Sequence, residues 1–402
     1  MAFSKILPVE IALDIFSRVP SESVLDSKLV CTSWNNLLRH PSFSRMHLKH
    51  LIHPSNSSSH SGKLGFLALT FWNNIFLYIE YKENHDHSTP IERITQIYFT
   101  PPFTSAEFLG SCNGLILLAR YSYKEPAPLC ICNPFTKEHV LLTEIKRDED
   151  TEDDKNSHWT SGFGYVASTD EYKVVRIMLK TEFFSVYIYT VGSGVGWRNL
   201  GRFNLGCSVY LYEQAGIFSD GALHWLDVES QMIVTFNLGE EKFSELLPPP
   251  PLPPIINSHC NRIGVVDGFL YFAMYLIVEE SEYYDVWLLH KKNGNSDMKE
   301  REEPRSFAWR KEFRVEENEV LAVTKSNGVL TCNYNYLHFY YTKASIWKRL
   351  IDYKENFSRV FPHKNTLVSL KELGEEDTKI MESVEVKETG SHDPSFNQLQ
   401  ED

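Results

Sequence analysis

Histidine and cysteine residues at short spacings are the groups in this 402-residue chain that could bind a metal ion. His47, His50 and His53 follow one another at steps of three in HLKHLIH, and Cys130 and Cys132 alternate along a predicted strand. Successive steps of three drift around a helix, and neither group has the further ligands that zinc requires at a recognisable spacing. The sequence therefore predicts a linker helix at the histidines, buried thiols at the two cysteines, and neither a metal site nor a cofactor.

Catalytic chemistry has equally little support. No serine, cysteine or threonine can be tied to a histidine and a carboxylate by a known motif, and no pair of carboxylates stands out from the acidic background. The glycine-rich VGSGVGW (residues 191–197) could suggest a phosphate-binding loop. A strand pattern follows it, however, whereas a phosphate cradle needs the N-terminus of a helix. We predict a hairpin turn there and assign no catalytic residue.

Charge and composition limit the class of protein. The formal net charge of −13 argues against general nucleic-acid binding, which needs a basic face. Glu10 and Asp14 interrupt the apolar run that a signal peptide would need, and there is no run of about eighteen apolar residues that could span a membrane. Seven scattered cysteines are typical of a compartment where thiols stay reduced. We expect no membrane association and a cytoplasmic or nuclear location, or both.

The first 43 residues have the spacing of three short helices. Ile11, Ile15 and Val19 recur along the first, between Pro8, which suits a first helical turn, and Pro20, which ends it. Ser23 with Asp26 resembles a cap for the second helix, and Thr32 or Ser33 can cap a third that ends near Pro41. A bundle this small, without a disulfide or a metal, does not reliably hold one core together. We therefore expect some of its apolar residues to face a neighbour.

The opening residues also resemble a known family. LPVEI, IFSRVP, KLVCTSW and LLRHPSF, in this order and spacing, resemble an F-box, the helical module that docks on the Skp adaptor of cullin-RING ubiquitin ligases. Val24 stands where many members have leucine, which keeps the site apolar. The alternative is a helical cap that packs only on the rest of the chain. The resemblance implies an adaptor-binding set of Leu7, Pro8, Ile11, Ile15, Val30, Cys31 and Trp34.

From about residue 62 to 370, short aromatic and β-branched runs separated by turn residues predict strands. CNGLILL, DGALHWL, DGFLYFA and SNGVLTC each place Asn-Gly or Asp-Gly before alternating apolar residues. A strand–turn–strand element follows each time, as in NPFTKEHVLL, at roughly the spacing of kelch-like blades. About six blades of a β-propeller are predicted rather than a sandwich, because a propeller leaves only short edges. We expect NTLVSL (residues 365–370) to add a late strand that helps to close the ring.

This half of the chain resembles the plant F-box-associated domain. The similarity lies in LGSCNGLILL, ICNPFTKE, GFGYVASTDEYKVVRI, VYIYTVGSGVGWRNLG, GALHWL, IVTFNLGEEKFSELLPPP and YDVWLL. Two departures fall near the fifth blade: a charged insertion before Trp309, and PPPPLPP (residues 248–254), which could stiffen a connection between blades or bind an SH3 or WW domain. The acidic RDEDTEDD (residues 147–154) could be a solvated loop, or it could repel wrong partners or attract a basic substrate.

The predicted fold is an α+β multidomain chain. Residues 1–50 form a three-helix F-box, 51–61 a linker, 62–370 the all-β kelch-like propeller, and 371–402, with ten acidic residues against three lysines, a disordered tail. The resemblance implies a non-enzymatic receptor of an SCF-type ubiquitin ligase that binds the Skp-type adaptor, through it cullin, and with its propeller a target protein that remains unidentified. Its aromatic content also leaves a carbohydrate- or glycoprotein-binding receptor open, and a propeller-housed enzyme is a further alternative.

Overall fold

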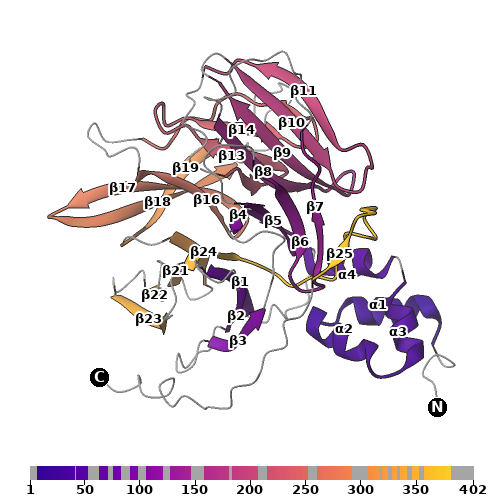
Figure 1. Cartoon of the computed structure of the whole chain (residues 1–402). Helices are drawn as coiled ribbons and strands as arrows, with labels where there is room; N and C mark the ends of the chain where they lie inside the picture. Colours follow the sequence, from indigo (N-terminus) through magenta and orange to yellow (C-terminus); the bar gives the residue numbers. More distant parts are fainter. Residues whose placement is uncertain are drawn as a thin grey trace, which may run out of the picture.

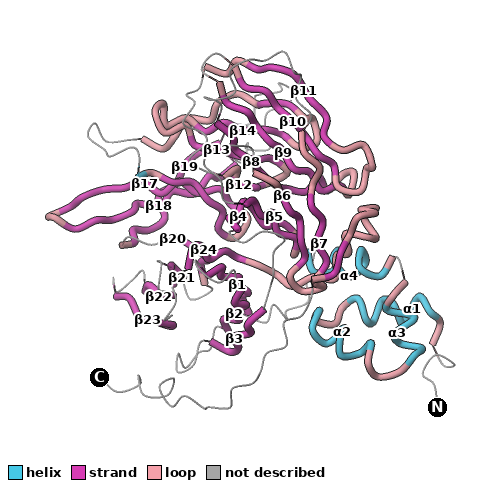
Figure 2. The backbone as a smooth tube through the Cα atoms, viewed as in Figure 1, coloured by secondary structure: helices cyan, strands magenta, loops and turns pink. Residues whose placement is uncertain are grey.

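The computed structural model describes seventeen stretches of the chain. They are residues 7–40, 42–52, 63–70, 76–82, 91–97, 106–120, 127–145, 158–180, 183–206, 215–251, 260–291, 307–316, 319–324, 328–332, 336–341, 346–352 and 357–381. Within them, four helices precede an array of strands, and the helices lie together beside it (Figures 1 and 2). No helix of these stretches is long and apolar enough to span a membrane.

The helical module consists of α1 (Val9–Ser17), α2 (Ser21–Lys28), α3 (Thr32–Leu38) and α4 (Phe43–Ile52). The first three helices are confirmed, although α2 begins directly after Pro20 instead of at the predicted cap Ser23. The structure adds α4, which packs against α1. This helix contains the predicted linker helix at His47 and His50, but its apolar side completes the module instead of linking two domains.

Twenty-five strands follow within the described residues. The first half comprises β1 (Lys63–Thr70), β2 (Phe76–Lys82), β3 (Ile91–Ile97), β4 (Ala106–Cys112), β5 (Leu115–Arg120), β6 (Leu129–Asn133), β7 (Glu138–Leu141), β8 (His158–Val166), β9 (Glu171–Leu179), β10 (Phe184–Thr190), β11 (Trp197–Phe203) and β12 (Ile217–Ser219). The second half comprises β13 (Ala222–Leu226), β14 (Ile233–Asn237), β15 (Lys242–Phe243), β16 (Arg262–Val266), β17 (Phe269–Val278), β18 (Ser281–Lys291), β19 (Phe307–Val315), β20 (Glu319–Val323), β21 (Gly328–Cys332), β22 (Tyr336–Tyr341), β23 (Ile346–Asp352), β24 (Phe357–Pro362) and β25 (Lys379–Ile380).

These strands form six antiparallel sheets arranged as the blades of a propeller. Blade 1 has the order β24-β1-β2-β3, blade 2 is β25-β7-β6-β5-β4, and blades 3 to 6 are formed by β8–β11, β12–β15, β16–β19 and β20–β23. The innermost strands β4, β8, β12, β16, β20 and β24 contact one another in turn, and β24 contacts β4. The ring is therefore closed, and the apolar side chains pack between neighbouring blades.

The repeated turns lie where the sequence placed them. Asn113–Gly114, Asp220–Gly221 and Asp267–Gly268 connect the first two strands of blades 2, 4 and 5, and all six residues have positive φ. This is the conformation of a two-residue hairpin turn that Asn-Gly and Asp-Gly favour. In the fourth pair, Asn327–Gly328, Asn327 lies outside the described residues and Gly328 is the first residue of β21.

Ring closure differs from the prediction in one respect. The closing strand is β24, which pairs with β1, whereas NTLVSL follows it as irregular chain. Here the carbonyls of Thr366 and Val368 accept hydrogen bonds from the Asn133 side-chain amide, at 3.1 and 2.8 Å, instead of from a strand. The Asn133 side chain thus provides hydrogen bonds that a neighbouring strand would otherwise provide. We call residues 363–381 the C-terminal strap.

The predicted disordered tail is wrong for its first part. Within residues 371–381, β25 pairs with β7 and Met381 is buried. The Glu375 carboxylate is buried and accepts hydrogen bonds from the Tyr189 hydroxyl at 3.1 Å and from the Gly192 N–H at 2.7 Å. The acidic composition was misleading because the Glu375 carboxylate is paired with hydrogen-bond donors of the protein instead of with solvent. Residues 382–402 lie outside the described residues.

Two other predicted features can be placed. VGSGVGW forms the hairpin turn between β10 and β11, as predicted. The described part of the proline run, residues 248–251, joins blades 4 and 5, and the carbonyl of Pro248 accepts a hydrogen bond from Trp309 Nε1 at 2.8 Å. The acidic RDEDTEDD and the inserted residues 292–306 lie outside the described residues, as does the predicted linker from residue 53.

Candidate functional site

The helical module leaves large apolar side chains in solvent. These are Val9 (53% exposed), Ile11 (49%), Ile15 (48%), Leu29 (85%) and Val30 (65%). These fractions hold with the propeller present, so the propeller does not cover these residues. Burying a side chain of this size removes roughly 1.5–3 kcal/mol of unfavourable hydration, which makes such an exposed set costly without a partner.

The rest of the module has an ordinary core. Leu13, Val24, Leu38 and Phe43 are buried together with Leu367 of the C-terminal strap. On α1, Leu13 points inward while Ile11 and Ile15, one helical turn apart, share the solvent side. Helix α1 thus has two apolar sides: one packs in the core of the module, and the other is exposed to solvent.

The predicted adaptor-binding residues fall into two groups. The structure leaves Pro8, Ile11, Ile15, Val30 and Cys31 exposed, and it half-buries Leu7 and Trp34. The Trp34 ring packs edge-on against Phe16 with 4.9 Å between ring centroids, so Trp34 supports the core as well as the surface. We name the exposed residues Val9, Ile11, Ile15, Leu29 and Val30 the apolar face.

Sequence reasoning missed two members of the apolar face. Val9 is the first residue of α1. Leu29 caps the C-terminus of α2, where the chain turns away. The signal was available, because Leu29 and Val30 form an apolar pair directly before the short third helix.

The module docks on the propeller through a different surface. The Ser21 hydroxyl donates to the Asn365 carbonyl at 2.7 Å, and the Asn365 side-chain amide donates to Glu22 Oε1 at 2.7 Å. Leu48 of α4 joins the apolar cluster of blades 2 and 3. The alternative of a helical cap therefore holds for one side of the module only, since the apolar face lies outside this contact.

Polar contacts extend this seam along α4. Arg45 forms an ion pair of 2.9 Å with Asp170 of the turn between β8 and β9. The Ser44 hydroxyl donates to the Glu372 carboxylate of the strap, and Lys364 Nζ donates to the Leu51 carbonyl at 2.7 Å. These contacts join the two ends of the described chain.

Three of the residues that could have bound a metal are used for packing. His47 is fully buried, its Nε2 lies 2.8 Å from the Val19 carbonyl, and burial lowers its pKa. Cys130 and Cys132 are buried in one apolar cluster, and burial raises the pKa of the Cys132 thiol. Within the described stretches, no three His, Cys, Asp or Glu side chains are placed to hold a metal ion.

The innermost strands carry a few charged side chains. Arg359 of β24 lies 3.9 Å from the Glu319 carboxylate of β20. Burial raises the pKa of Glu107 on β4, and the charge of Arg359 opposes this shift. One arginine thus balances two carboxylates from neighbouring blades, an arrangement that joins blades 1, 2 and 6.

Comparison with known proteins agrees with this architecture. Residues 5–49 match the F-box-like family, and residues 63–286 match the F-box associated beta propeller domain family. The chain is similar to an F-box/kelch-repeat protein of Arabidopsis thaliana, with 26% identity over 70% of this chain and 75% of that protein. It is also similar to an F-box protein of Arabidopsis thaliana, with 27% identity over 67% of this chain and 66% of that protein.

Solved structures show a weaker likeness. A chain of a nidogen–laminin complex is similar over 75% of this chain and 99% of its own length, at 9% identity and a TM-score of 0.40. The domain matches carry the assignment, because they place a helical module at residues 5–49 and a propeller from residue 63 onward, in the order that the structure shows. The chain belongs to the plant F-box proteins that carry a C-terminal F-box-associated β-propeller domain.

Proposed function

We propose that the chain is the substrate-recognition subunit of an SCF-type ubiquitin ligase. The apolar face binds a Skp-type adaptor and through it cullin, while the propeller holds a target protein for ubiquitination by other subunits. The observation that carries this proposal is that the apolar face stays exposed although the module is docked on the propeller.

The arrangement supports a non-catalytic role. Docking through α4 and the strap fixes the module against blade 2, so a target bound to the propeller is held at a set position relative to the adaptor. We propose a cytoplasmic or nuclear location for this assembly, where the adaptor and cullin act.

The proposal is tested by paired truncation of Leu29 and Val30 to alanine in the full chain. Anchor residues at an apolar interface typically cost about 2 kcal/mol or more when truncated, so adaptor affinity should fall by at least roughly thirtyfold. The measurement is calorimetric titration of the purified adaptor, with circular dichroism to check folding. Because both side chains are exposed, the fold should remain intact.

A matched control uses two exposed apolar residues of the propeller. Leu141→Ala with Val195→Ala removes side chains that are 45% and 68% exposed, and adaptor affinity should not change. Leu7→Ala with Pro8→Ala tests the beginning of the predicted set in the same assay. If the folded Leu29/Val30 and Leu7/Pro8 variants both kept the wild-type affinity for the adaptor, the proposal that the adaptor binds to this face would be wrong.

A further inference from the structure

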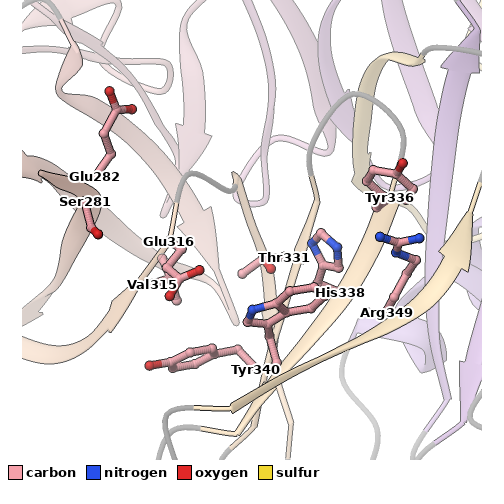
Figure 3. Close-up of a pocket in the computed structure, with 10 residues that line it drawn as sticks. Ser281, Glu282, Val315, Glu316, Thr331, Tyr336, His338, Tyr340 and Arg349 are labelled. Atoms are coloured by element: carbon pink, nitrogen blue, oxygen red, sulfur yellow. The ribbon is translucent and has the colours of Figure 1, made fainter. Parts of the chain in front are cut away.

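A cavity of about 420 Å³ lies between blades 5 and 6, away from the helical module. Figure 3 shows Glu282 and Glu316 on the blade 5 side and Tyr336, His338 and Arg349 on the blade 6 side. Its volume is that of a site for one side chain or a small ligand. We call it the aromatic–acidic pocket.

Strand register gathers the aromatic groups on one face of blade 6. Tyr336, His338 and Tyr340 alternate along β22, and Tyr340 pairs with Trp347 of β23. Residues that pair across strands share a face of the sheet, so Tyr340 and Trp347 lie side by side in the pocket wall. Trp347 is 49% exposed, which leaves a large aromatic surface for a ligand.

The charge of the pocket is negative. Glu282 and Glu316 line it, and Arg349, the one arginine among its described lining residues, already lies over the Tyr336 ring at 4.1 Å. Burial and the charge of Arg349 lower the pKa of His338, which disfavours a positive charge on this imidazole. Two carboxylates beside exposed aromatic rings attract a cation, because the ring face is electron-rich.

A projecting hairpin extends this surface. β17 and β18 protrude from blade 5 (Figure 1) and are joined by Glu279 and Glu280, both at positive φ. This turn normally takes Asn-Gly, yet here both positions are acidic. Ile277, which is 64% exposed, pairs with Glu282 and therefore lies on the pocket side of the hairpin.

The Glu282 carboxylate is held in place. It accepts a hydrogen bond from Tyr275, which raises the pKa of Tyr275 to about 12. The Tyr275 ring packs against Tyr284 with 5.5 Å between ring centroids. The acidic side of the pocket is thus positioned by blade 5 alone, before any ligand binds.

We propose that the aromatic–acidic pocket binds a lysine or arginine side chain of the target protein, with an apolar neighbour of that residue on Ile277. The cation stacks on Trp347 and Tyr340 and pairs with Glu282 and Glu316. This inference rests on the proposed function in one respect only: the bound side chain is taken to belong to the target protein. The exposed acidic turn at Glu279 and Glu280 favours a basic segment over a neutral or acidic one.

The test uses the full chain labelled with 5-fluorotryptophan and fluorine NMR. Trp347→Phe identifies the Trp347 resonance, and the probes are N-acetyl-arginine amide, N-acetyl-lysine amide and the uncharged, nearly isosteric N-acetyl-citrulline amide. The cationic probes should shift the resonance saturably and citrulline should not. Glu282→Gln with Glu316→Gln should weaken binding of the cationic probes at least about tenfold.

Matched variants separate the pocket from general charge effects. Glu240→Gln removes an exposed carboxylate from the β14–β15 turn and should leave probe binding unchanged. An equal response to citrulline, or no response to either cationic probe, would overturn the proposal. So would a saturable shift with N-acetylglucosamine or N-acetyl-aspartate amide alone, which would assign the pocket to a sugar or an anion.

Adaptor titration with the same pocket variants keeps this inference separate from the proposed function. Glu282→Gln with Glu316→Gln should not affect adaptor affinity, because neither residue belongs to the helical module. If the Leu29/Val30 and Leu7/Pro8 variants also retained adaptor affinity while cationic probes bound, the pocket would stand and the receptor role would fall.

Discussion

Trp225 and Phe236 of the propeller are completely buried between blades, whereas Ile11, Ile15 and Leu29 of the helical module are about half exposed or more. Both regions are rich in apolar side chains, so composition does not explain the contrast. In a closed ring each blade has two neighbours that cover its two faces. The module has one neighbour, and its uncovered side remains apolar.

The two regions also differ in how complete their cores are. The propeller builds its clusters mainly from its own strands, with Leu48 of α4 added to one of them, while the core of the module contains Leu367 from the strap and packs against Phe135 of blade 2. A module of four short helices is too small to be reliably stable alone. It therefore takes part of its core from the propeller on one side and keeps the other side for a partner.

The largest expected effect comes from removing the chain after residue 356. This deletes β24, which closes the ring, and the strap that completes the module, so we expect no cooperatively folded protein. A cut after Lys371 keeps the ring but removes β25, Glu375 and Met381, and it should cost a few kcal/mol, as burial of one large side chain and charged hydrogen bonds would suggest.

Scanning calorimetry of chains ending at residues 356, 371 and 381 measures these differences in stability. The chain ending at Met381 serves as the control because it keeps every described contact. Equal thermal midpoints for the chains ending at 371 and 381 would show that the strap contributes nothing. A folded propeller without β24 would show that closure is not needed.

A single substitution in the seam sharpens the comparison. Leu367→Ala leaves a cavity in the core of the module, and such truncations cost about 2–5 kcal/mol. Hydrogen-exchange mass spectrometry should show faster exchange in α1–α4 with little change in blades 4 and 5. Leu223→Ala, at a fully buried position of β13, is the matched control and should have the opposite distribution. The same pattern in both variants would mean that module and propeller unfold as one unit.

Local signals predicted the fold more completely than the site. Asn113–Gly114 and Asp267–Gly268 mark blades because such turns are encoded by two adjacent residues. The strap was missed because Leu367 lies in NTLVSL, which has the pattern of a strand, whereas Glu375 and Met381 lie in acidic chain without a period. The aromatic–acidic pocket could not be predicted at all, since it joins positions from 281 to 349 through strand register.

Mild acid should act on both regions through buried histidines. Burial lowers the pKa of His47 in the module and of His224 in the propeller, the latter to about 4. Each stays neutral when folded but takes up a proton when unfolded below about pH 6.5, so stability is lost as the pH falls from there towards the folded pKa. At pH 5.5 this amounts to about 1.4 kcal/mol for His224, and His47 adds a loss in the same direction.

Urea unfolding at pH 7.5 and 5.5 tests this, followed by far-ultraviolet circular dichroism. His47→Gln can still donate to the Val19 carbonyl but does not titrate, and it should remove about one histidine's share of the loss. An identical pH dependence in wild type and variant would mean that His47 is protonated in the folded module.

The smallest effect is expected at the tip of the β17–β18 hairpin. Here the propeller, like the helical module with its apolar face, has an energetically unfavourable feature at its surface. Glu279 and Glu280 both have positive φ, which costs on the order of 1 kcal/mol at a residue with a side chain. Glu279→Asn with Glu280→Gly should therefore raise the stability of blade 5 by about 1 kcal/mol, seen as slower hydrogen exchange in β17 and β18.

Because the two charges lie beside the aromatic–acidic pocket, the same variant should bind N-acetyl-arginine amide severalfold less tightly, with a smaller difference at high salt. Asp220→Asn is the control, since it makes the same kind of change at a turn in blade 4, which does not line the pocket. A gain in stability without any loss of probe binding would show that the acidic turn is unrelated to the pocket, whereas a loss of both would show that the observed turn geometry depends on the two glutamates themselves.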